Sequence, residues 1–320
     1  MNTAPDNQRG EPGASPDVTA RALVSEGPQS NFLGLPEEAS RYETSRVVVL
    51  PMPFERTTSY GKGTALGPAA ILAASRQVEL WEEMLRSEPW RMGIATLLPF
   101  VPEARDAQAA LAEIEAEAGR HLAAGKFLVT LGGEHSLTTA PVRAARLVHG
   151  ELAVVQFDAH ADLRPEYDGT PWSHASVMRR LHEDGFPALA VGIRALCDEE
   201  AALIADKGLP TIWGWELPAR ERFLAELDRL PEKVYLTFDV DFFDPSLMPA
   251  TGTPVPGGGA WYPTLDCLRE LFARKTVVAM DVVELAPQAG AHGADFLAAS
   301  LVHKCLAYLQ AAEASRARRG

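Results

Sequence analysis

The sequence predicts an α/β fold in which helices cover a mostly parallel sheet of about eight strands. From Arg46 onward, short runs rich in Val, Leu and Ile alternate with segments of helical periodicity, which is the pattern of repeated strand and helix units. Most of these runs are apolar at every position, as expected of strands that are covered on both faces. The chain has 320 residues and is 47% hydrophobic, which is enough for a large core.

Eight apolar segments are predicted strands, and helices are predicted between them. The strands are expected at 47–52, 94–100, 127–131, 152–158, 188–193, 210–214, 234–241 and 276–285. The helices are expected at 67–85, with Pro68 in the first turn, and at 104–124, 137–148, 175–183, 197–206, 216–229, 264–274 and 293–312.

The chain is expected to consist of a tail and one domain. Residues 1–30 are dominated by Pro, Gly, Ser, Asn, Gln and charged residues, which bury too little apolar surface to offset the entropy of ordering. We therefore expect a flexible N-terminal tail. No linker rich in Pro, Gly and Ser divides the rest, so residues 31–320 are predicted to form a single domain, with two domains as the alternative.

Charge and cysteine content exclude several classes of partner. The formal net charge is −13, which disfavours nucleic acid and anionic membrane surfaces. The three cysteines form no CxxC pair and suggest neither a disulfide framework nor a thiolate zinc site. No apolar run approaches the roughly 20 residues of a membrane span, and no basic segment followed by an apolar stretch opens the chain. We expect a cytoplasmic protein.

Ionisable side chains follow three of the predicted strands. Asp158, His160 and Asp162 leave the strand at 152–158, and in an extended chain they would point the same way, about 6.6 Å apart. Asp239 and Asp241 repeat this spacing at the end of another strand. A single DxD pair would more often be a helix or turn cap. Five buried ionisable groups without counter-charge would be costly, so the combination favours a bound cation.

A third contribution is the segment Gly132–Gly133–Glu134–His135–Ser136, which follows the strand at 127–131. The glycines allow close backbone approach, and Ser136 is expected to cap the helix that follows. Strand ends of this kind are where open α/β sheets bind ligands. Two histidines and four aspartates without sulfur favour a hard ion such as Mn²⁺, and their number suits two ions that generate hydroxide at neutral pH.

In this order, the motifs resemble those of the ureohydrolase family, and the agmatinase branch fits best. They are GGEHS at 132–136, DAHAD at 158–162, SHASVMRR at 173–180 and FDVDFFDPSLMPATGTPVPGG at 238–258. The resemblance implies an arginase-like three-layer α/β/α sandwich, two Mn²⁺ per subunit and a trimer or hexamer. It also implies hydrolysis of the guanidinium group of agmatine to putrescine and urea, a step of polyamine biosynthesis.

The resemblance also implies a role for each site residue. The first manganese would be held by His135, Asp158, Asp162 and Asp239, and the second by His160, Asp158, Asp239 and Asp241. Asp158 and Asp239 would bridge the two ions, and Asp162 would orient the hydroxide. Glu284 would pair with the substrate guanidinium, although taken alone it fits an exposed charge at a strand end. His174 or Asp162 would carry a proton to the leaving amine, although His174 could instead cap or pack at the start of a helix.

Several alternatives concern the substrate and the class of function. Residues 163–170 lack the Asn/Ser-rich stretch of arginase-like sequences, which speaks against arginine, and Glu166 and Asp168 could favour a cationic tail. Ala250 stands where glycine is usual, so the loop around it is expected to differ if the backbone there is left-handed. Aminopropylagmatine or another guanidino or formimino compound is the alternative substrate. A catalytically silent binding subunit is the non-enzyme alternative, and a nucleotide-dependent transferase is disfavoured because no phosphate-binding loop occurs.

Overall fold

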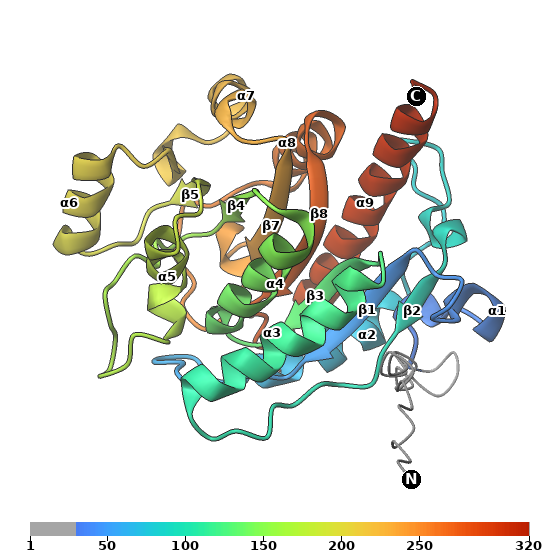
Figure 1. Cartoon of the computed structure of the whole chain (residues 1–320), viewed down its shortest axis with the longest axis horizontal. Coiled ribbons are helices and arrows are strands. Elements are labelled where there is room, and N and C mark those ends of the chain that lie inside the picture. Colours follow the sequence, from blue (N-terminus) through green and yellow to red (C-terminus); the bar gives the residue numbers. More distant parts are fainter. Residues whose placement is uncertain (1–29, 320) are drawn as a thin grey trace, which may run out of the picture.

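The computed structural model describes residues 30–319 of the chain (Figure 1). The predicted N-terminal tail therefore lies outside the described residues, apart from residue 30. Within residues 30–319, no helix combines the length and hydrophobicity that a bilayer crossing requires.

A single eight-stranded sheet forms the centre of the molecule. Its strands lie in the order β2-β1-β3-β8-β7-β4-β5-β6, and every neighbouring pair is parallel. The strands are β1 (Val47–Met52), β2 (Ile94–Thr96), β3 (Phe127–Gly132), β4 (Ala153–Phe157), β5 (Ala188–Ile193), β6 (Thr211–Trp213), β7 (Lys233–Asp239) and β8 (Thr276–Val283). The predicted parallel sheet of eight strands is confirmed.

Helices cover both faces of the sheet and make three layers (Figure 1). Helices α2 (Gly67–Ser75), α7 (Arg220–Arg229), α8 (Trp261–Arg274) and α9 (His292–Ala317) share one core cluster with the sheet. The other core cluster contains α3 (Ala107–Ala123), α4 (Thr139–His149), α5 (Val177–Glu183) and α6 (Asp198–Lys207). A short α1 (Glu37–Ser40) precedes β1. In β1, Val47 and Val49 face the first cluster while Val48 and Leu50 face the second, as the alternation of strand side chains requires.

Some predicted boundaries are too long. The helix expected at 67–85 ends at Ser75. After it, the backbone N–H groups of Gln77 and Val78 donate to carbonyls three residues back, as in turns, and Arg86 has a left-handed φ of 55°. The strand expected at 94–100 ends at Thr96, because Pro99 has no N–H to donate to a ladder. The strand expected at 234–241 ends at Asp239, since Val240–Phe242 form a 3₁₀ turn.

The sheet order brings four strand ends together. Strands β3, β8, β7 and β4 are consecutive neighbours in the middle of the sheet, and all of them run in the same direction. The segments that follow them therefore leave the same edge side by side, although they are far apart in the sequence. Every predicted metal ligand and Glu284 belongs to one of these four segments.

Candidate metal centre

Five of the six predicted ligands form two groups that share one aspartate. His135, Asp158 and Asp162 form the first group, and Asp158, His160 and Asp241 form the second, with the ligand atoms of each group within 4.8 Å of one another. His135 Nδ1 lies 3.1 Å from Asp158 Oδ2 and 3.0 Å from Asp162 Oδ2, and His160 Nδ1 lies 2.9 Å from Asp241 Oδ2. Asp158 therefore stands between two places where a cation could bind.

Asp239 lies at the edge of the first group. Its Oδ2 is 3.6 Å from His135 Nδ1, and its Oδ1 accepts a hydrogen bond of 2.9 Å from the backbone N–H of Asp241. Asp239 is buried and lines the same cavity as the two histidines. Its position is compatible with a shared ligand, and the bridging role stays a prediction.

The backbone after β4 is not extended, although the predicted alternation of side chains along residues 158–162 required an extended chain. Strand β4 ends at Phe157, and the N–H of His160 turns back to donate to Asp158 Oδ1 at 2.6 Å. Asp162 has a left-handed φ of 53°, which is uncommon outside glycine. The prediction that the side chains of Asp158, His160 and Asp162 point the same way is therefore wrong. His160 faces Asp241 and Asp162 faces His135, because the chain curls around the Asp158 carboxylate.

Hydrogen bonding around His135 fits a metal ligand. Asp281 Oδ1 accepts the hydroxyl hydrogen of Thr237 at 2.7 Å, so Thr237 Oγ1 accepts from His135 Nε2–H at 2.8 Å. The proton of the neutral ring then sits on Nε2, and the lone pair of Nδ1 points at the oxygens of Asp158 and Asp162. Nδ1 is buried without a hydrogen-bond partner. A cation between these acceptors would satisfy all of them.

The electrostatics of the cluster also call for positive charge. Burial and the neighbouring charge of Asp158 raise the pKa of Asp162 to about 7. Burial alone lowers the pKa of His160, but the carboxylates of Asp241 and Asp158 outweigh it and raise this pKa to about 12. Protons therefore balance the buried carboxylates when no metal does so, and metal binding would displace them.

Glu284 lies beside the cluster at the end of β8. Its φ is 65°, its N–H donates to the carbonyl of Gly133 at 2.8 Å, and its Oε1 accepts from the backbone N–H of His135 at 2.6 Å. The side chain is buried, and burial raises the pKa of the Glu284 carboxyl well above its usual range. The reading of Glu284 as an exposed charge at a strand end is therefore excluded.

A cavity of about 170 Å³ opens onto the cluster, and His174 and Glu284 both line it. The His174 ring packs edge-on against Tyr167 with centroids 5.6 Å apart, and its Nδ1 is 3.2 Å from Thr57 Oγ1. Burial lowers the pKa of His174. The structure thus brings all eight predicted site residues to one place.

Sequence reasoning missed four polar residues that support the site: Thr57, Glu134, Thr237 and Asp281. Thr237 and Asp281 lie inside apolar strand runs, and a polar residue in a fully buried strand is a signal that could have found them. Thr57 belongs to an irregular segment with no such signal. Glu134 belongs to the GGEHS motif, but nothing in the sequence around it indicates a role for its side chain.

Two smaller expectations concern Ser136 and Ala250, and only the one for Ser136 was wrong. Ser136 caps no helix, because its hydroxyl donates to Glu134 within the same turn. Ala250 is buried and does not have a positive φ, so alanine fits the loop without strain.

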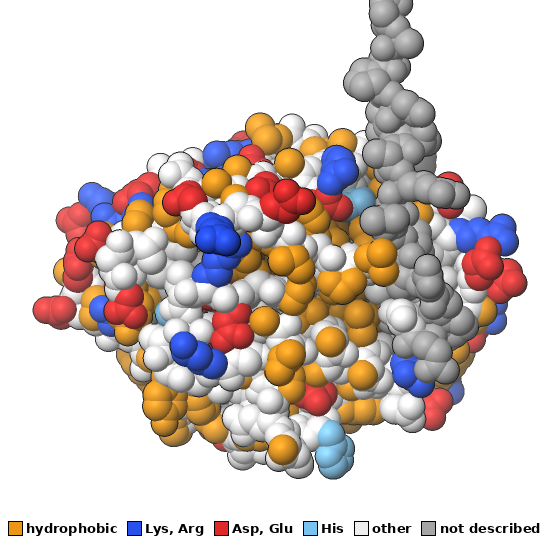
Figure 2. Space-filling view, turned by 90° about the horizontal axis from the view of Figure 1, so that it is seen from below, with side chains coloured by type: hydrophobic (Ala, Val, Ile, Leu, Met, Phe, Trp, Pro, Cys, Tyr) orange, Lys and Arg blue, Asp and Glu red, His pale blue; other side chains and the backbone are white. Residues whose placement is uncertain are grey.

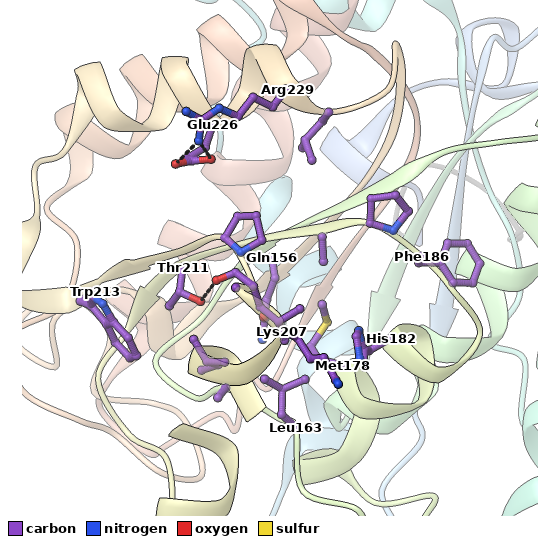
Figure 3. A pocket seen from close by; sticks show the side chains of 18 of the residues that line it. Gln156, Leu163, Met178, His182, Phe186, Lys207, Thr211, Trp213, Glu226 and Arg229 are labelled. Atoms are coloured by element: carbon purple, nitrogen blue, oxygen red, sulfur yellow. Dashed lines mark hydrogen bonds and ion pairs between the residues drawn. The ribbon is translucent and has the colours of Figure 1, made fainter. Parts of the chain in front are cut away.

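A larger cavity of about 760 Å³ lies near β5 and β6 (Figure 3). Figure 3 shows the pair of Glu226 and Arg229 on one side, Met178 and His182 on the other, and Gln156 between them. Gln156 Nε2 donates to Asp158 Oδ2 at 2.9 Å, so this residue separates the larger cavity from the metal cluster. Neither group of metal-ligand side chains lines the larger cavity, so the smaller cavity is the candidate active site.

Comparison with known proteins agrees with this geometry. Residues 45–308 match the model of the arginase family. An N(1)-aminopropylagmatine ureohydrolase from Synechocystis is 41% identical over 280 residues, covering 85% of this chain and 92% of that protein. An agmatinase from Pyrococcus horikoshii is 33% identical over 259 residues, covering 80% of this chain and 89% of that protein.

The solved structure of agmatine ureohydrolase from Thermoplasma volcanium superposes with a TM-score of 0.79 at 29% identity, covering 88% of this chain and 94% of that one. The family model, the relatives and the clustered ligands agree. The chain belongs to the arginase family of ureohydrolases, which are metal-dependent hydrolases of amidino C–N bonds.

Proposed function

We propose that this chain hydrolyses N(1)-aminopropylagmatine, releasing urea and the triamine that remains when the amidino group is removed. The observation that carries the proposal is the 41% identity over 280 residues to a relative of that name, against 33% to an agmatinase. Agmatine, which the sequence motifs favoured, is the second candidate, and the similarity to the agmatine ureohydrolase structure supports it. Both compounds carry the same guanidinobutyl group, so they differ only beyond the reacting end.

The rim of the small cavity is suited to a longer substrate. The cavity holds about 170 Å³, which is enough for the guanidinium and part of the alkyl chain. Tyr60, which is 82% exposed, and Tyr167 both line this cavity. Aromatic faces attract ammonium groups. Glu166 and Asp168 are exposed and do not line the cavity, and the Arg164 guanidinium lies over the Tyr167 ring, so we assign recognition of the cationic tail to Tyr60.

We assign the ions as Mn²⁺ because the donor set is rich in oxygen and lacks sulfur. The ions would be held by His135, Asp158, Asp162, Asp239, His160 and Asp241, and when bound they would supply hydroxide at neutral pH. Glu284 would hold the guanidinium through its buried carboxylate, because a planar fork of N–H donors pairs well with carboxylate oxygens. His174 would deliver a proton to the departing amine nitrogen.

Urea release measured on a substrate panel tests the proposal. Full-length protein with added Mn²⁺ is assayed on N(1)-aminopropylagmatine, agmatine, arginine, guanidinobutyrate and formiminoglutamate. We expect the highest kcat/KM on N(1)-aminopropylagmatine. A higher value on agmatine would select the second candidate, and no turnover of any cationic guanidine at full manganese occupancy would favour a silent binding subunit.

We also propose that the protein acts in the cytoplasm as a trimer or hexamer. Figure 2 shows hydrophobic side chains gathered on one face between acidic and basic ones. Large apolar side chains that are more than half exposed include Leu66, Trp81 and Val101. Light scattering coupled to size exclusion measures the assembly directly, and a mass of one subunit, 34.6 kDa, would contradict this assignment.

A further inference from the structure

Glu134 precedes the predicted metal ligand His135 in the chain, but its carboxylate accepts hydrogen bonds from other residues and lies in neither group of metal-ligand side chains. Its Oε2 accepts from the backbone N–H groups of Arg56 at 2.5 Å and Thr57 at 2.6 Å. Its Oε1 accepts from the hydroxyl of Thr57 at 2.8 Å and from the hydroxyl of Ser136. Glu134 is fully buried, and four donors surround its two oxygens. The carboxylate therefore acts only as an acceptor.

This arrangement determines which way the Thr57 hydroxyl points. A hydroxyl has one hydrogen and two lone pairs, and the hydrogen of Thr57 is donated to Glu134. Thr57 Oγ1 also lies 3.0 Å from the backbone N of His174 and 3.2 Å from its Nδ1. With its only hydrogen committed, Thr57 accepts at both contacts. Nδ1 of His174 must therefore carry a proton.

We propose that Glu134 and Thr57 are positioning residues that hold His174 in the Nδ1–H tautomer, which leaves Nε2 as the basic nitrogen. The proposal rests on the proton-transfer role given to His174 in the proposed function. In that role Nε2 takes up the proton released when water is ionised to hydroxide and passes it to the departing amine nitrogen, while Nδ1 keeps its own proton. The imidazole therefore ends the cycle as it began.

The two contacts from one hydroxyl also fix the orientation of the ring. Thr57 holds the His174 backbone and ring together, and Tyr167 packs edge-on against the ring. Two ring orientations are otherwise accessible to a histidine by rotation about its Cβ–Cγ bond. Only one of them places Nδ1 on Thr57. The same hydroxyl therefore selects both the tautomer and the ring nitrogen that is left without a contact to Thr57.

Thr57→Val is the sharpest perturbation, because valine has the shape of threonine but no hydroxyl. The backbone N–H of residue 57 still donates to Glu134, so the loop keeps its attachment. Thr57→Ser keeps the hydroxyl and is the matched control. On the preferred guanidino substrate we expect Thr57→Val to lower kcat by about tenfold to hundredfold with little change in KM, and Thr57→Ser to restore most of the rate.

Nitrogen NMR of the histidine rings provides a readout that does not depend on turnover. The full chain is labelled with ¹⁵N-histidine and loaded with diamagnetic Zn²⁺, and the His174 signals are assigned by their loss in His174→Gln. We expect a protonated Nδ1 and an unprotonated Nε2 in the parent protein, and a mixture of tautomers in Thr57→Val.

The outcomes separate this inference from the proposed function. An Nε2–H tautomer in the parent protein, or an unchanged tautomer and unchanged kcat in Thr57→Val, would overturn the inference. If the parent protein shows the Nδ1–H tautomer but cleaves no guanidino compound, the positioning of His174 stands and the proposed function fails.

Discussion

Replacing Glu284 by Gln tests how the guanidinium is held. In the native chain one carboxylate oxygen accepts from the His135 N–H at 2.6 Å, and the side chain lines the cavity with the metal-ligand cluster. Glutamine has one carbonyl oxygen and one NH₂ group. If its oxygen stays on His135, the NH₂ group faces a substrate that has only donors. If the amide turns over, the NH₂ group faces the His135 N–H instead. Either orientation leaves two donors opposed.

The expected cost is that of removing one partner from a buried, charged hydrogen-bonded pair, about 2 to 5 kcal/mol. Since each 1.36 kcal/mol changes the rate constant tenfold, kcat/KM should fall by roughly 30-fold to 5000-fold. Glu284 belongs to neither ligand group, so the metal content should stay unchanged.

Urea release and metal analysis of the same preparations measure both quantities, and inhibition by free guanidinium ion reports binding without turnover. Glu103→Gln removes the same charge from an exposed position and is the control. A kcat/KM within threefold of the parent value, or loss of bound metal, would refute the assignment of Glu284 to the guanidinium.

Three further predictions follow from other parts of the structure. Asp239→Ala should abolish activity and lower the metal bound per subunit, and full metal retention in elemental analysis would contradict its bridging role. Lys304→Met should lower the free energy of unfolding in urea by about 3 to 5 kcal/mol, because it removes the cation that contacts the buried Glu82 carboxylate at 2.5 Å and leaves the Leu85 N–H as a donor to it. A loss below about 1 kcal/mol would refute this. Burial lowers the pKa of His121 to about 4, so between pH 6.5 and 4 the unfolded chain binds a proton that the native state does not. The free energy of unfolding should fall by up to about 3 kcal/mol from pH 6.5 to pH 4, and the fall should be smaller in His121→Gln. Equal slopes of unfolding free energy against pH in the parent protein and in His121→Gln would contradict this prediction.

The sequence predicted the strands better than their ends. All eight predicted strands exist because uninterrupted apolar runs bury on both faces whatever their order in the sheet. The predicted strands are too long where the chain stays apolar after it leaves the sheet, as at Leu97–Phe100 and around Asp241. Apolar composition reports burial and does not by itself report hydrogen bonding in the ladder.

Residue types and their placement after strands were enough to identify the chemistry of the site, because carboxylates and imidazoles at buried strand ends need a cation. Contacts between segments were decided by the tertiary structure. The neighbouring order of β3, β8, β7 and β4 joins His135 to Asp162, and the left-handed backbone of Asp162 separates it from His160. The hydroxyl of Thr57 reaches His174 across 117 positions of sequence, and no local pattern encodes such a contact. Local periodicity reflects the preferences of single segments, whereas proton positions and ligand pairing depend on atoms that only folding brings within hydrogen-bond distance.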